Sequence, residues 1–583
     1  MLIEDQQLLF YQRCHRRAFL DVYGDRTQKE PPSDFLLKLI ADSGAYRKTV
    51  LGDRTYSQPE YPYKDWEAGF QATLELMKQG ADRIYRGVLL FHTNRPPAQL
   101  PEEAPSQGGA GAIDSPPSQG GTGDLYSPPS QGGTGDLYSP PSQGGAGDLY
   151  SPPSQGGAGG DLSTHKSDLI LDSDREFLSR LPDGITLLSH PDLLVKIPGV
   201  SVFGDWTYIP QDIRLGKRPK LDYQLVAALH AQILAWVQGT MPDRSVLLLR
   251  DRRPYSMNLG QRLPQLHDMI LDYITMLQER QEPEIFISRQ KCSLCQWHAD
   301  CHAIAKSQNH LCLLPGITPN RQTRLETLNL TTVESLARTS PEDLNLYPEF
   351  ENGIAQQVIR QAEAVWQNRA ILRSESEGDG NGTIPDQNNS RNGSEPDPFW
   401  LQAPVELYFD IEAQPDLNLD YLHGVLVVDR RSHTETFYPL LAETMADEEA
   451  IWEQFLTLVW RYPIAPIFHF CDYEAKTIAR LAKLYKTPSY LWRPLMKRLV
   501  DVHHQVVQTV TLPVESYALK SIARWIGFEW RDGKANGAQC VCWYEQWLKT
   551  GDRTLLDAIV RYNEDDCRAT YHVKRWLADF VQS

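Results

Sequence analysis

The sequence predicts an α/β protein with more than one domain. Its 583 residues exceed what one hydrophobic core usually organises, since chains split into domains beyond about 250–300 residues. Segments with the 3.6-residue periodicity of helices alternate with short apolar segments typical of strands. Two stretches with few apolar residues interrupt this alternation and divide the chain.

The first interruption, residues 103–161, repeats the unit SPPSQGGTGDLY with a period of about 12 residues. A Pro/Gly/Ser/Gln composition buries too little apolar surface to offset the entropy of ordering, so it predicts a disordered insertion. A short solenoid is the alternative, with one Leu-Tyr pair per unit to bury. The second interruption, residues 373–399, is typical of a flexible linker.

Residues 1–310 form the first expected domain, and the repeats fall inside it. The patterns predict a helix, three strands, a helix and a strand, at 66–80, 83–92, 185–197, 200–215, 221–238 and 245–251. Gly80 is a suitable residue to end the first helix. The repeats then lie in the loop between the first two strands, where an insertion costs little.

Two acids stand out in this domain. Asp192 lies on the second predicted strand, and Asp212 lies near the end of the third. If the strands are neighbours, both carboxylates could hold a divalent cation that activates water against a phosphate, with Arg214 as a fixed positive charge beside them. Two solvated acids at strand ends are the alternative.

This order of elements, with Asp192 and the Asp-x-Arg of residues 212–214, resembles the RecB-type nucleases of the PD-(D/E)xK superfamily. The resemblance implies a mixed sheet flanked by helices, metal ligands at Asp192 and Asp212, and a catalytic role for Arg214. The family has lysine at position 214, and arginine is bulkier and cannot lose its proton. The glutamine that the family presents from the next helix is also missing, since Val226 takes its place opposite His230.

Three cysteines in KCSLCQWHADC, namely Cys292, Cys295 and Cys301, follow the pattern C-x2-C-x5-C. Some RecB-type nucleases hold a [4Fe-4S] cluster with such a triplet and one cysteine near the N-terminus. The resemblance therefore implies a cluster bound by these three residues and Cys14. A zinc site that recruits His298 or His302, or four ordinary thiols, remain alternatives.

Residues 311–372 are expected to form short helices that join the two larger domains. The segment resembles a helix-hairpin-helix element, whose backbone amides can hold a phosphate. A helical spacer is the alternative.

The last predicted domain, residues 400–583, contains acids in three separate segments. A strand reading PVELYFDIEAQ places Asp410 and Glu412 on one face, because side chains alternate along a strand. HFCDYEAKTIARL follows, with Glu474, or alternatively Asp472, as its acid. In VRYNEDDCRATYHV, Tyr562 and Asp566 are four residues apart and share one face of a helix.

These three segments resemble the RNase H-like DEDD exonucleases, in particular their YprB-like branch. The resemblance implies that Asp410, Glu412, Glu474 and Asp566 surround two Mg²⁺ or Mn²⁺ ions, and that Tyr562 orients the attacking water. Asp501 is a further position of this branch without an assigned role.

Together these patterns predict a cytoplasmic, metal-dependent nuclease that hydrolyses DNA at ends or in single strands, in repair or defence. The start of the chain lacks the features of a secretory signal, and no apolar run is long enough to span a membrane. A net charge of −17 confines nucleic-acid binding to local surfaces such as residues 214–220 and 250–254. A helicase or repair partner is conceivable and unidentified. The alternatives are a nucleic-acid-binding scaffold with a degenerate first site, and an RNA-processing exonuclease.

Overall fold

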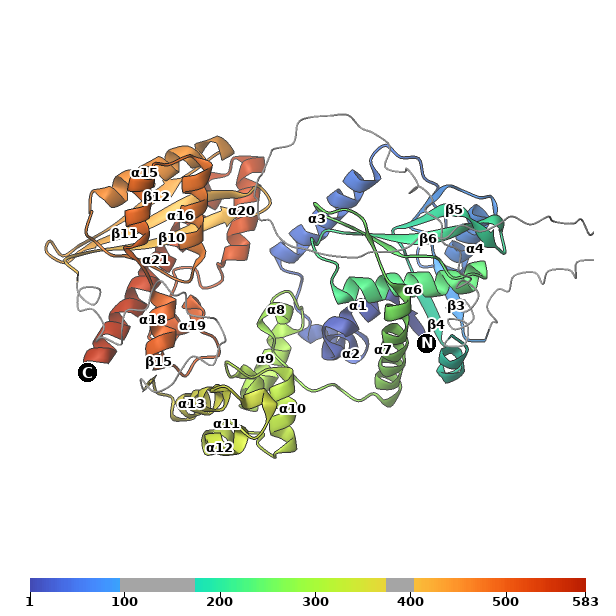
Figure 1. The fold of residues 1–583 in the computed structure, drawn as a ribbon, viewed down its shortest axis with the longest axis horizontal. Coiled ribbons are helices and arrows are strands. Elements are labelled where there is room, and N and C mark those ends of the chain that lie inside the picture. The colour runs from blue at the N-terminus through green and yellow to red at the C-terminus, as the bar shows by residue number, and fades with distance from the viewer. Residues whose placement is uncertain (95–173, 374–402) are drawn as a thin grey trace, which may run out of the picture.

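The computed structural model describes residues 1–94, 174–373 and 403–583. The predictions for the repeats at 103–161 and for most of the linker at 373–399 concern residues outside these ranges. The described chain is α/β, with mixed sheets and many helices, as the sequence predicted (Figure 1). No helix among these residues is long and apolar enough to cross a membrane.

The larger sheet of the N-terminal lobe (the described residues up to 310) has five strands in the order β2-β5-β6-β7-β8. Its strands are β2 (Arg83–Tyr85), β5 (Leu193–Ser201), β6 (Gly204–Arg214), β7 (Val246–Leu249) and β8 (Tyr255–Ser256). β5 and β6 are antiparallel, whereas β6 and β7 are parallel. A smaller sheet joins β1 (Leu2–Glu4), β4 (Thr186–Ser189) and β3 (Leu89–His92).

The helix α6 (Leu221–Gln238) connects β6 to β7 and forms the centre of this lobe. It is buried on nearly every side because apolar residues surround it, and its neighbours pack into one core. Other helices of the lobe include α1 (Asp5–Arg13), α2 (His15–Tyr23), α3 (Asp34–Leu51), α4 (Trp66–Lys78), α7 (Leu259–Glu279), α8 (Arg289–Cys292) and α9 (His298–Ser307). The helices predicted at 66–80 and 221–238 and the strand at 245–251 are therefore confirmed.

The strands predicted at 83–92 and 185–197 are wrong in one respect, because each is two strands, one in the larger sheet and one in the smaller. Ile84 pairs with Leu194 in the larger sheet, and Leu90 pairs with Leu188 in the smaller one. Arg86 has φ of 52° and breaks the extended backbone. The pattern alone could not show this break, since apolar residues continue through both strands.

The helical segment from 311 to 367 has its own small core. It comprises α10 (Pro319–Thr327), α11 (Val333–Ala337), α12 (Pro341–Leu344) and α13 (Ile354–Gln367). Side-chain caps from Thr318, Thr332 and Ser340 begin three of these helices. After α13, β9 (Ile371–Leu372) pairs with β15 (Val510–Thr511) and so attaches the segment to the C-terminal domain.

The C-terminal domain contains a five-stranded sheet in the order β12-β11-β10-β13-β14. Its strands are β10 (Val405–Gln414), β11 (Leu419–Asp429), β12 (Thr434–Leu441), β13 (Ile467–His469) and β14 (Leu499–Asp501). One face packs against α15 (Glu448–Trp460), α16 (Tyr473–Leu484) and α17 (Ser489–Met496). The other packs against α18 (Val502–Thr509), α19 (Leu519–Trp525), α20 (Gly537–Thr550) and α21 (Arg553–Gln582).

Ion pairs join the two large parts of the chain. Lys38 on α3 lies 3.0 Å from Asp416 in the turn after β10 and 3.0 Å from Glu545 on α20. Arg250, just beyond β7, also binds Asp416 at 2.9 Å. In Figure 1, α3 accordingly lies between the sheet of the N-terminal lobe and α20.

Gly424 on β11 provides a test of the packing between the sheet and α21. It pairs with Asp410 across the sheet, and a Cβ at this position would collide with the amide of Asn563 on α21. We expect Gly424→Ala to lower the free energy of unfolding by about 1–3 kcal/mol, since an overpacked core must shift. Thermal unfolding measures this, and Gly537→Ala is the control because open space surrounds Gly537. An unchanged melting temperature for Gly424→Ala would contradict the close contact.

Candidate active site

Three carboxylates from two elements of the C-terminal domain meet at one point. Asp410 and Glu412 lie on β10, and Asp566 lies on α21. One oxygen of each lies within 4.8 Å of the other two, and no other group of three His, Cys, Asp or Glu side chains in the described chain satisfies this limit. Such a set of oxygen ligands suits Mg²⁺ or Mn²⁺.

The alternation of β10 places the two strand acids. Leu407, Phe409 and Ile411 face the core under α15 and α16, so the residues between them face α21. Glu406 on this second face is fully buried and binds Lys574 of α21 at 2.7 Å. This ion pair holds α21 against β10 at a point eight residues beyond Asp566 along the helix.

Two neutral donors hold the acids in place. The amide of Asn563 donates to Asp410 at 2.7 Å, and the indole N–H of Trp530 donates to Asp566 at 2.7 Å. Each acid therefore keeps oxygen lone pairs for another ligand, because a carboxylate accepts more than one bond.

Burial raises the pKa of each acid, and repulsion from the neighbouring acids adds to it for Asp410 and Glu412. Burial has the largest effect on Asp410, followed by the charges of Asp566 and Glu412, and together they raise its pKa well above the ordinary value. The pKa of Glu412 is raised in the same way, mainly by burial and then by Asp566. Burial raises the pKa of Asp566 to about 6, although Trp530 and Tyr562 oppose the change. A bound divalent cation would relieve this repulsion, so the residues fit the metal that the sequence implied.

Glu474 is the fourth acid, and the alternative Asp472 is turned away. Glu474 is buried, and its negative charge contributes to the raised pKa of both Asp410 and Glu412. His469 lies 3.6 Å from Glu474 and is the nearest cation candidate. Asp472 instead pairs with Lys476 in solvent, with 71% of its side chain exposed.

Asp501 lies close enough to Glu474 to raise its pKa. It accepts hydrogen bonds from the backbone N–H groups of Cys471 and His504, at 3.0 and 3.2 Å. Asp501 thus fixes the backbone at Cys471, three residues before Glu474 on α16, which gives it a positioning role.

Tyr562 faces the acids from α21, and Lys520 lies over its ring. Burial and the neighbouring acids raise the pKa of Tyr562, so its phenol keeps its proton. The ammonium of Lys520 lies 4.8 Å from the ring centre, and its charge lowers the pKa of Asp566 and of Glu412. Sequence reasoning missed Lys520, Trp530 and Asn563, because none belongs to a spacing pattern that marks a metal site.

The comparisons with known proteins agree with this arrangement. Residues 407–578 match a family model described as the RNase H superfamily. This part of the chain is an RNase H-like domain. Neither the curated proteins nor the solved structures gave a match. The RNase H-like domain indicates nucleic-acid hydrolysis, and the finer likeness to the YprB-like branch stays a prediction.

The acids of the N-terminal lobe also meet, but each is already paired. Asp192 lies just before β5 rather than on a strand, and one oxygen accepts the backbone N–H of Ile213 at 2.8 Å. Its other oxygen binds Arg47 of α3 at 2.9 Å. Asp212 lies 3.3 Å from His230 and 3.4 Å from Arg214.

The two acids of the N-terminal lobe differ in pKa. Burial and then Asp212 raise the pKa of Asp192. Burial would also raise the pKa of Asp212, but the charges of His230 and Arg214 outweigh it and lower the pKa. Although burial opposes it, Asp212 raises the pKa of His230, which favours the protonated ring. Arg47, Arg214 and His230 thus already offset part of the negative charge at this pair, and its role as a metal site stays a prediction.

Gln224, in the first turn of α6, is bonded to groups other than these acids. It donates to the carbonyl of Pro219 at 2.6 Å and accepts from Arg262 at 2.8 Å. His230, opposite Val226 in the sequence pattern, reaches Asp212 instead.

The four cysteines that the sequence grouped are neighbours. Burial raises the pKa of Cys292, Cys295 and Cys301, and the nearby Cys14 raises it further in all three. The pKa of Cys301 reaches about 11. Residue 14 lies between α1 and α2, whereas the other three lie in or near α8 and α9, so the cluster joins two distant parts of the lobe.

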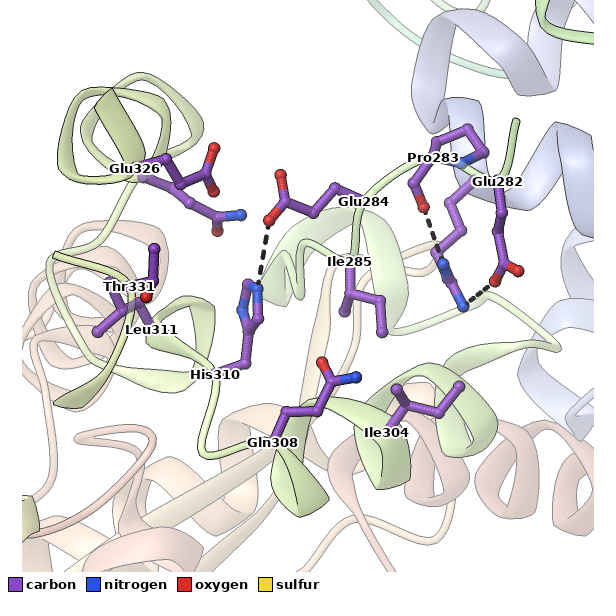
Figure 2. A pocket seen from close by; sticks show the side chains of 12 residues that line it. Glu282, Pro283, Glu284, Ile285, Ile304, Gln308, His310, Leu311, Glu326 and Thr331 are labelled. Carbon is purple, nitrogen blue, oxygen red and sulfur yellow. Dashed lines mark hydrogen bonds and ion pairs between the residues drawn. The ribbon is translucent and has the colours of Figure 1, made fainter. Parts of the chain in front are cut away.

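A cavity of about 550 Å³ opens beside this junction, between α2 and the helical segment (Figure 2). Arg16 binds Glu282 at 2.5 Å and donates to the carbonyl of Pro283 at 2.8 Å. On the far side, Glu284 lies 3.6 Å from His310. The contacts of Arg16 hold the segment after α7 against α2. None of the residues that line the cavity belongs to the acid cluster of the C-terminal domain.

The raised pKa values predict how metal and pH affect the stability of the C-terminal domain. A carboxyl whose folded-state pKa is raised stabilises the fold below its unfolded-state pKa, near 4, and this stabilisation is lost as pH rises through the folded value. Without metal, we expect the melting temperature to fall between about pH 4 and 7. Mg²⁺ should raise it again, most at the upper end.

Asp410→Asn tests this prediction in a thermal-shift series with and without Mg²⁺. The substitution keeps the shape and removes one charge, so the metal-free protein should become more stable at pH 7 and respond less to Mg²⁺. The matched control is Asp472→Asn, since Asp472 is exposed and paired outside the cluster. Equal Mg²⁺ responses in both variants would place the metal elsewhere.

Proposed function

We propose that this protein is a metal-dependent exonuclease whose reaction takes place at Asp410, Glu412, Glu474 and Asp566. The observation that carries the proposal is the meeting of three buried or half-buried carboxylates, each with a raised pKa, within an RNase H-like domain. Bound divalent metal would polarise the scissile phosphate and lower the pKa of the attacking water. The protein's own groups then orient the strand and the water.

Tyr562 and Lys520 are the groups in position for that work. The phenol remains protonated and can donate a hydrogen bond to a phosphate oxygen or to water. Lys520 is the cation placed beside Asp566 and Glu412, so it can counter charge that develops on the phosphate. Trp530 and Asn563 act as positioning residues through their bonds to Asp566 and Asp410.

DNA is the substrate we favour, in repair or defence, and RNA is the alternative that the same chemistry allows. In the N-terminal lobe, Asp192 pairs with Arg47, and Asp212 pairs with Arg214 and His230. These pairs favour a role in binding nucleic acid over a role in cleaving it. We therefore propose a lobe related to the RecB-type nucleases whose acid pair contributes structure rather than cleavage.

Single substitutions in a nuclease assay distinguish the contributions of the two acid sites to cleavage. Asp410→Ala should reduce Mg²⁺-dependent cleavage of labelled single-stranded DNA by about 10³-fold, because losing about 4 kcal/mol of transition-state stabilisation has that effect. Asp192→Ala should leave cleavage within about threefold, since its partners are fixed cations. Parallel assays on RNA and duplex DNA define the substrate.

The opposite ranking, with Asp192→Ala inactive and Asp410→Ala active, would assign the reaction to the N-terminal lobe. Arg214→Lys supports the comparison, because it restores the residue of the family pattern beside Asp212. Thermal unfolding of each variant checks that the substituted protein is folded.

For the four cysteines, we propose a [4Fe-4S] cluster that fastens the start of the N-terminal lobe to its end. Arg16 lies near Cys301 and Arg17 near Cys295, and their positive charges oppose the effect of burial on the pKa of these two thiols.

Anaerobically purified protein should therefore be brown, with a broad absorption band near about 400 nm. Cys14→Ala should remove most of the band and lower the melting temperature of the N-terminal lobe, because the fastening is lost. Cys542→Ala is the control, since this buried thiol lies on α20. A colourless protein with one bound zinc would replace the iron–sulfur assignment by the zinc alternative.

A further inference from the structure

Two loops of the N-terminal lobe bring basic side chains together beside the C-terminal domain. Residues 214–220 and 250–254 contain seven basic residues and one acid, in a chain whose net charge is −17. The backbone N–H of Arg250 donates to the carbonyl of Gly216 at 3.3 Å, so the loops touch. We define the basic patch as six of these basic side chains: Lys217, Arg218, Lys220, Arg250, Arg252 and Arg253.

Most of this charge is available to a ligand. Lys217, Arg218, Lys220, Arg252 and Arg253 are exposed. Lys217 pairs with the exposed Asp251 at 3.2 Å, a contact that is worth little in water. Within the described ranges, no ion-pair partner lies against Arg218, Arg252 or Arg253, whose charge no structural contact uses.

The patch adjoins the strand that carries the candidate catalytic acids. Arg250 binds Asp416, which follows Glu412 by four residues in the turn after β10. Four residues span at most about 15 Å between Cα atoms. Lys38 binds the other oxygen of Asp416, so this acid is neutralised and does not repel a polyanion at the junction.

We propose that the basic patch holds the phosphate backbone of a single nucleic-acid strand whose end lies at Asp410, Glu412 and Asp566. This inference rests on the proposed nuclease function and adds the surface that binds the substrate. A strongly negative protein repels nucleic acid except where positive charge is concentrated, and the patch provides that concentration next to the acids. A single strand fits better than a duplex, because Glu412 and Asp566 are buried and Asp410 is half-buried.

Lys220 adds a second kind of contact to the patch. Its ammonium lies 6.0 Å from the ring centre of Tyr223, and the guanidinium of Arg214 lies 5.5 Å from the same ring. Surfaces that bind single strands combine cations with aromatic rings on which bases stack. Tyr223 is half-buried beneath these cations. The patch therefore binds phosphates mainly through its charges, and stacking of a base on Tyr223 adds a smaller contribution.

The test removes three cations that no described contact uses. The variant R218A/R252A/R253A is compared with R461A/K483A/K497A, which removes three exposed cations from the opposite side of the C-terminal sheet. Fluorescence anisotropy with a labelled single-stranded 20-nucleotide DNA in Ca²⁺ measures binding. We expect the first variant to raise Kd at least about tenfold and to reduce the slope of log K against log salt by about 2, at about 0.7 per lost phosphate contact. The control should change both by less than half as much.

A second measurement separates this proposal from the proposed function. The p-nitrophenyl ester of thymidine 5′-monophosphate is too short to reach the patch, so both variants should hydrolyse it within about twofold of the wild type. Equal binding losses in the two variants, with the ester still cleaved, would overturn the patch and leave the nuclease assignment standing. If the wild type cleaves neither ester nor DNA, the nuclease assignment fails, while the anisotropy comparison still decides whether the patch binds nucleic acid.

Discussion

The C-terminal domain is organised around a group of carboxylates that repel one another. Asp410, Glu412 and Asp566 lie within reach of a single ion, with Glu474 beside them, and burial makes their charges more costly. Such a group is kept together only if the surrounding structure imposes it. β10 is held between β11 and β13, and the pair formed by Glu406 and Lys574 fixes α21 against it. The acids therefore meet because two rigid elements meet.

This explains which parts of the site could be predicted from the sequence. The period of two along β10 and the four-residue spacing on α21 are local, so Asp410, Glu412, Tyr562 and Asp566 could be placed on the correct faces before their partners were known. Lys520, Trp530 and Asn563 reach the acids only through tertiary packing. The same limit applies to the fold, where the break at Arg86 depends on two sheets that no local pattern describes.

In the N-terminal lobe the sequence predicted the acids but could not predict their counter-ions. Asp192 and Asp212 meet, and Arg47 from α3 and His230 from α6 meet them there. Arg214, two residues after Asp212, is the one counter-ion that local spacing revealed. The two acid groups therefore differ in their counter-ions. Side-chain cations balance Asp192 and Asp212, whereas Asp410, Glu412 and Asp566 could be balanced by a bound metal ion.

Helix α3 links these two solutions. Arg47 near its C-terminal end binds Asp192, and Lys38 near its N-terminal end binds Asp416 and Glu545 of the C-terminal domain. The two residues are nine positions apart, about 13 Å along a helix with a rise of 1.5 Å per residue. A rigid helix that is held by ion pairs near both ends fixes the distance between the residues that it binds. The paired acids of the first lobe therefore act as an anchor, and they hold the basic patch and the acids of the RNase H-like domain at a fixed separation.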